Sequence, residues 1–131
     1  MAPLRPDPKS GLLYVRELPR RIQHVTVWVR DLPAAIAWYR DVLGLPLRLS
    51  DAKWAEFNTD GVTLILRPKD PREPSGGRTG VTFSIHDLGS CLTILQTRGV
   101  KVNHGPEAVL ANVRVAEIED LEGNRITLAG R

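Results

Sequence analysis

The sequence has few of the features that mark specialised protein classes. One cysteine, Cys91, among 131 residues excludes an internal disulfide and is typical of a reducing compartment. No apolar run approaches the ~18 residues of a membrane-spanning helix. The N-terminus begins with prolines and charged residues instead of the apolar segment of a signal peptide. We therefore expect a cytoplasmic protein that does not contact membranes.

Excess charge is also small, and it is confined to one end of the chain. The sequence has 18 Lys and Arg against 15 Asp and Glu, a net charge of +3. Residues 1–21 contain five basic and two acidic residues, so the rest of the chain is balanced. A nucleic-acid-binding domain carries a basic stripe on its folded body. We therefore expect no nucleic-acid partner.

What the sequence does contain is an internal repeat. Residues 24–32 read HVTVWVRDL and residues 80–88 read GVTFSIHDL, with four of nine positions identical. In both copies, strand-like alternation gives way to the apolar spacing of a helix. Asp31 and Asp87 stand at helix N-cap positions, and Gly44 and Gly99 stand where a helix ends. The pattern predicts a strand followed by a helix, twice.

Three short strand-like segments follow each predicted helix. They cover residues 45–49, 54–58 and 62–67 in the first half, and residues 100–103, 113–118 and 125–128 in the second. An acidic residue followed by glycine precedes the last strand of each half, at Asp60-Gly61 and Glu122-Gly123. The sequence thus predicts an α+β fold of two βαβββ modules that form one curved mixed sheet around a cleft, with the helices outside.

The same reading divides the chain into four parts. They are a Pro-rich basic arm (1–20), a first module (21–69), a linker rich in Pro, Gly and charge (70–79) and a second module (80–131).

This duplicated unit, which opens on a histidine-bearing strand and places an acidic-Gly turn before its last strand, resembles the vicinal oxygen chelate superfamily. That superfamily includes glyoxalase I, extradiol dioxygenases, fosfomycin-resistance enzymes and bleomycin-resistance proteins. The resemblance covers residues 22–131. It implies a homodimer, with the N-terminal arm as a candidate contact to the partner. It does not imply one activity, because the scaffold serves several chemistries and also simple binding.

The resemblance also identifies the positions at which metal-dependent members bind their ion. Carried onto this sequence, these positions are occupied by His24, Ile65, Gly80 and Thr127. A catalytic divalent ion needs about three protein ligands. Because the sequence departs from the family's ligand pattern at three of these positions, we expect a scaffold without metal ligands, catalytic residues or cofactor. An ion held by His24 with an off-pattern carboxylate such as Glu56 or Glu117 stays open.

Strand alternation predicts which side chains face the cleft. Val25, Val27 and Val29 face the helix, which turns the alternate residues the other way. The predicted ligand-binding residues are His24, Thr26, Trp28, Trp54, Glu56, Asn58, Arg67, Thr82, Ser84 and Thr127. The two indoles either stack on a planar ligand or fill the cavity. Glu56 is either a general base or an ion-pair partner of a neighbour such as Arg67, and Arg67 either holds an anion or lies in water at the rim.

Three functions remain open on these residues. We favour a metal-independent protein of bleomycin-resistance type that binds a small organic molecule. The alternative is a lyase, isomerase or dioxygenase with a rearranged metal or acid–base set, which acts on a small carbonyl or catechol. The third is an accessory subunit whose cleft has lost its function.

Overall fold

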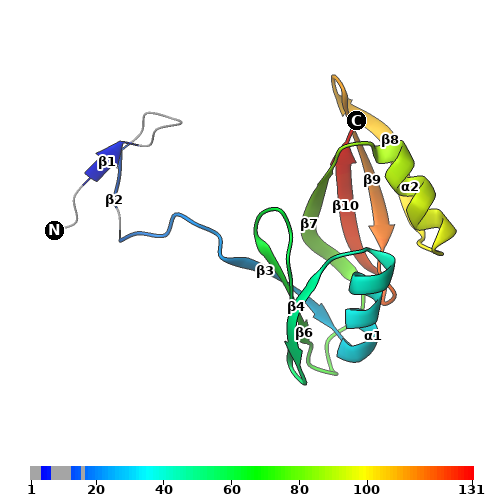
Figure 1. Cartoon of the computed structure of the whole chain (residues 1–131), viewed down its shortest axis with the longest axis horizontal. Helices are drawn as coiled ribbons and strands as arrows, with labels where there is room; N and C mark the ends of the chain where they lie inside the picture. Colours follow the sequence, from blue (N-terminus) through cyan, green and yellow to red (C-terminus); the bar gives the residue numbers. More distant parts are fainter. Residues whose placement is uncertain (1–3, 7–12, 16) are drawn as a thin grey trace.

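The computed structural model describes residues 4–6, 13–15 and 17–131. Figure 1 shows two modules side by side, each with a sheet and a helical segment, and an N-terminal strand pair that lies away from both. That pair consists of β1 (Leu4–Pro6) and β2 (Leu13–Val15), which run antiparallel. In the described part of the chain, no helix is long and apolar enough to cross a membrane.

Each module has the predicted order of one strand, one helix and three strands. The first consists of β3 (His24–Val29), α1 (Leu32–Ala37), a π-helical turn η1 (Trp38–Val42), β4 (Leu47–Asp51), β5 (Trp54–Phe57) and β6 (Thr63–Pro68). The second consists of β7 (Gly77–Ile85), α2 (Leu88–Thr97), β8 (Val102–Leu110), β9 (Val113–Glu119) and β10 (Asn124–Gly130). The prediction of two βαβββ modules is confirmed.

The eight module strands form two four-stranded sheets, where the sequence analysis expected one continuous sheet. The strand orders are β3-β6-β5-β4 and β7-β10-β9-β8. In each sheet the first strand of the module runs parallel to the last, and the other pairs are antiparallel. Because β3 and β7 are edge strands of separate sheets, side chains and helices join the modules instead of strand pairing.

The local signals at the helix ends are confirmed. The Asp31 carboxylate accepts a hydrogen bond from the Ala34 amide at 3.1 Å, and Asp87 does the same for Ser90 at 3.1 Å. Gly44 follows the first helical segment at a φ of 83°, a left-handed conformation that strongly favours glycine. Each helix therefore begins and ends where its sequence predicts.

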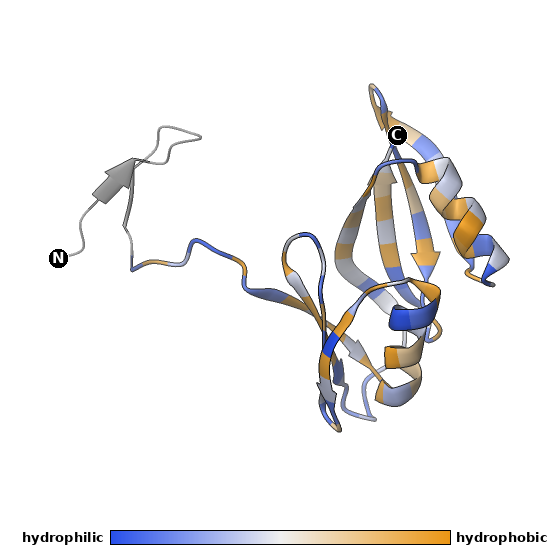
Figure 2. Cartoon of the chain, in the orientation of Figure 1, coloured by the Kyte–Doolittle hydropathy of each residue, from blue (hydrophilic) through white to orange (hydrophobic). Residues whose placement is uncertain are grey.

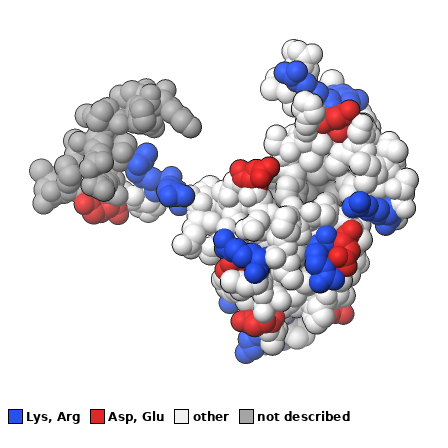
Figure 3. Space-filling view, in the orientation of Figure 1, with Lys and Arg blue, Asp and Glu red and all other residues white. Residues whose placement is uncertain are grey.

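The core lies between each sheet and its helix. Val27 and Val29 of β3 are buried there, together with Phe57 of β5 and Leu128 of β10. Figure 2 shows the resulting bands of apolar and polar residues along the strands. On the surface in Figure 3, basic and acidic side chains are interspersed over the visible face of the modules, as the balanced charge predicts.

A buried carboxylate connects the modules. The Tyr39 hydroxyl of the first module donates a hydrogen bond to Asp120 Oδ2 at 2.7 Å. Within the second module, Asp120 Oδ1 accepts from the backbone amides of Glu122 and Asn124, both at 2.9 Å, and Oδ2 accepts from Asn124 Nδ2 at 2.8 Å. All four donors point at one side chain, so its charge is compensated although Asp120 is only 6% exposed.

Glu122 adds a second connection close to the first. Its carboxylate oxygens accept from the backbone amides of Arg30 at 2.6 Å and Asp31 at 2.9 Å, immediately before α1. The turn between β9 and β10 therefore holds both the beginning of the first helix and the tyrosine that follows it.

The Tyr39–Asp120 contact gives a testable stability effect. Tyr39→Phe should lower the free energy of unfolding by about 2 kcal/mol at neutral pH, since it removes a buried hydrogen bond to a charged acceptor. Urea unfolding of the two proteins measures the difference.

The same tyrosine predicts how stability depends on pH. Burial, followed by the charge of Asp120, raises the pKa of Tyr39 well above its ordinary value of 10.0. Above pH 10.0 the unfolded chain releases this proton while the folded chain keeps it. The free energy of unfolding therefore falls as the pH rises above that ordinary value. Tyr39→Phe should reduce this loss between neutral pH and about pH 11. Equal losses in both proteins would contradict the assignment.

Candidate functional site

Two tryptophans and an arginine meet on the face of the first sheet that points away from the helix. The parallel register places Trp28 of β3 beside Arg67 of β6, and β5, which carries Trp54, lies on the other side of β6. Arg67 Cζ lies 5.0 Å from the ring centroid of Trp28 and 5.1 Å from that of Trp54. Both distances are in the range of cation–π interactions. The guanidinium therefore contacts both indoles.

The two indoles differ in how firmly they are held. Trp54 Nε1 donates a hydrogen bond to Glu56 Oε1 at 2.9 Å, and the His24 ring lies edge-on to Trp54, with centroids 6.1 Å apart. Trp28 is 45% exposed. The face thus combines a fixed indole with one that is open to solvent.

Glu56 is paired with Arg48, which the sequence analysis did not consider. Arg48 Nε lies 3.0 Å from Glu56 Oε2, and Arg67, the neighbour suggested from the sequence, contacts the indoles instead. Arg48 is the extra residue of a bulge in β4, between the pairs Leu47–Phe57 and Leu49–Glu56. Hydrogen bonds from Trp54 and then Arg48 lower the pKa of Glu56, which makes it a weaker general base.

The remaining predicted site residues are divided between the sheets. Thr26 stands on the same face as His24 and Trp28 and pairs with Ile65 of β6. Thr127 of β10 pairs with Thr82 of β7 in the second sheet. The structure therefore divides the predicted site between the two sheets.

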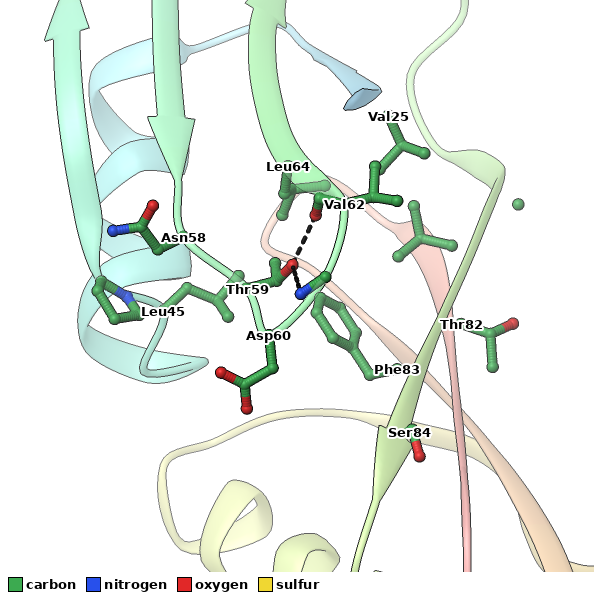
Figure 4. Close-up of a pocket in the computed structure, with 14 residues that line it drawn as sticks. Val25, Leu45, Asn58, Thr59, Asp60, Val62, Leu64, Thr82, Phe83 and Ser84 are labelled. Carbon is green, nitrogen blue, oxygen red and sulfur yellow. Dashed lines mark hydrogen bonds between the residues drawn. The ribbon is translucent and has the colours of Figure 1, made fainter. Parts of the chain in front are cut away.

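A groove of about 850 Å³ lies between the β5–β6 turn of the first module and β7 of the second. Among the described residues, the predicted site residues that line it are Asn58, Thr82 and Ser84. Figure 4 shows Phe83 of β7 pointing towards the turn at Thr59, where the Thr59 hydroxyl donates to the Val62 carbonyl at 2.6 Å. Strand alternation predicts that Val25 faces the helix, and the structure places it in the apolar lining of this groove. Leu64, Val81 and Phe83 complete that lining.

The four positions that bind metal in related enzymes do not fit a divalent ion here. Strand register makes Thr26–Ile65 and Thr82–Thr127 equivalent pairs, as the alignment of the repeats expects. Ile65 is aliphatic and buried, and Thr127 offers only a neutral hydroxyl. Gly80 has no side chain and stands in a bulge at a φ of 75°. Within the described ranges, no three His, Cys, Asp or Glu side chains are grouped to hold an ion.

Comparison with known proteins agrees with this architecture. A solved protein from Sphaerobacter thermophilus DSM 20745, described as a member of the glyoxalase/bleomycin resistance protein/dioxygenase superfamily, shares the fold at a TM-score of 0.77, with 20% identity over 86% of this chain and 98% of the other. TnmS3, described as an antibiotic-binding protein from Streptomyces sp. CB03234, has a TM-score of 0.74 and 27% identity over 86% of this chain and 96% of its own. A metallothiol transferase, FosB from Staphylococcus haemolyticus, is 25% identical over 112 residues, which are 82% of this chain and 81% of FosB.

The family match covers nearly all of both modules. Residues 21–128 match the family described as the Glyoxalase/Bleomycin resistance protein/Dioxygenase superfamily. The repeat, the two βαβββ modules and this match together show that the chain belongs to that superfamily.

Proposed function

We propose that the chain binds a small organic molecule, without a metal ion, on the face of its first sheet that points away from the helix. The observation that carries this proposal is the pair of indoles on the side of the sheet that does not supply the core, with Trp28 45% exposed. Large aromatic side chains in such a position favour ligand contact over packing. The likeness to TnmS3, described as an antibiotic-binding protein, supports the same function.

The donor set supports binding without metal. FosB is named a metallothiol transferase, yet of the four superfamily positions only His24 offers a strong ligand in this chain. The lowered pKa of Glu56 also disfavours the enzymatic alternative in which this carboxylate acts as a base.

Calorimetric titration of the full chain with Ni²⁺, Mn²⁺, Zn²⁺ and Fe²⁺ tests this proposal. We expect no tight stoichiometric uptake of any of the four ions, because one imidazole cannot satisfy a catalytic site. His24→Ala and His86→Ala form a matched pair, since His86 is an exposed histidine at the start of α2. Tight uptake of one ion per chain that is lost in His24→Ala and kept in His86→Ala would contradict the proposal.

We also propose that the chain forms a homodimer to which the N-terminal arm contributes. β3 and β7 each pair on one side only, and unpaired sheet edges favour association. The strand pair of the arm stands apart from the modules in Figure 1, which supports a contact outside its own chain. The cytoplasmic location stays a prediction from the single cysteine.

Sedimentation velocity of the full chain and of residues 20–131 tests both parts. The full chain should sediment as a dimer, and removal of the arm should weaken the dimer at equal concentration. A monomeric full chain would contradict the dimer, and an equally stable truncated dimer would contradict the role of the arm.

A further inference from the structure

No carboxylate of the described residues compensates the charge of Arg67. Among the residues that the structure describes, the ion pairs engage Arg48 with Glu56 and leave Arg67 without an acidic partner within 4.0 Å. Hydrogen bonds from Trp54 and Arg48 keep the pKa of Glu56 low, so its negative charge persists and is balanced by Arg48. The face formed by Arg48, Glu56 and Arg67 therefore carries one net positive charge.

The N–H groups of Arg67 are also available. A guanidinium has five N–H donors, arranged to pair with a planar anion. No hydrogen bond from this guanidinium to another described residue accompanies its contacts with the two indoles. The rings hold the cation in place without satisfying its donors.

The accessible indole provides the second half of a recognition site. Trp28 is 45% exposed and stands next to Arg67 in the strand register. An aromatic ring packed against the exposed part of Trp28, on the side where the guanidinium lies 5.0 Å from the indole centroid, would bring a substituent on its edge to Arg67. An anionic substituent would accept a charge-assisted hydrogen bond from the Arg67 guanidinium. A cationic substituent would be repelled by Arg67, which already contacts both indoles.

We propose that the face of the first sheet that carries Trp28, Trp54 and Arg67 binds planar aromatic anions, such as aryl carboxylates, through packing against the exposed part of Trp28 and pairing with Arg67. This inference rests on the proposed function and specifies its ligand class. Trp54 and Glu56 are positioning residues in this arrangement. Glu56 accepts a hydrogen bond from Trp54 and pairs with Arg48, so it does not pair with Arg67.

Three probes of one shape test the inference on the full chain. They are 2-naphthoate, 2-naphthamide and 2-naphthylmethylammonium, each titrated up to millimolar concentration by calorimetry and by NMR of the ¹⁵N-labelled protein. The chain has three tryptophans, so its indole N–H spectrum is simple to assign by Trp→Phe substitution. Trp38, which packs against the core, is an internal control for Trp28 and Trp54.

We expect 2-naphthoate to bind about tenfold more tightly than the cationic probe and to shift the Trp28 and Trp54 signals more than that of Trp38. Arg67→Gln should remove this preference and Arg67→Lys should keep part of it. Arg78→Gln, which changes an exposed arginine on β7, should leave it intact. The unchanged Trp38 signal reports that each variant is folded.

Two results would overturn the inference in different ways. The neutral or cationic probe could bind at Trp28 as tightly as 2-naphthoate or more tightly, or folded Arg67→Gln could keep the preference for 2-naphthoate. Either result would refute the anionic ligand class and leave the proposed small-molecule binding intact. Failure of all three probes to shift Trp28 or Trp54 would refute the inference together with the proposed binding face.

Discussion

The Asp120 carboxylate is the contact on which the arrangement of the two modules depends. The two module sheets share no strand pairing, so their relative position depends on side chains. Asp120 of the second module accepts a hydrogen bond from Tyr39 of the first. Three further donors hold the Asp120 carboxylate in the β9–β10 turn. The neighbouring Glu122 accepts two backbone amides at the beginning of α1. The groove between the β5–β6 turn and β7 lies between the two modules that these contacts join.

Given that arrangement, strand alternation produces the candidate site. Each strand that buries valines against its helix must turn the residues between them to the opposite face. In β3 this commits Val27 and Val29 to the core and leaves Trp28 open, next to Arg67 on the parallel partner strand. The proposed binding on this face needs no Lewis acid, because the aromatic surface and the positive charge both come from side chains that the fold already places together.

The sequence predicts local features well and the assembly of the site less well. The repeat, the caps at Asp31 and Asp87 and the burial of Val27 and Val29 follow from short-range patterns, and the structure confirms them. The Arg48–Glu56 pair was not foreseen, since it depends on a bulge that shifts the register of β4. Strand alternation also predicts on which face of its sheet Thr82 lies. It does not predict whether that face lies against the first module. The ten predicted residues therefore divide between two sheets, and their role in binding stays a proposal.

The most direct test of the account is an anomalous diffraction experiment on crystals grown with both Zn²⁺ and 2-naphthoate. The account predicts density for the naphthyl ring on Trp28, with its carboxylate at Arg67, and no zinc peak within bonding distance of His24. A zinc peak at His24 that is coordinated by two or more further protein side chains would contradict it.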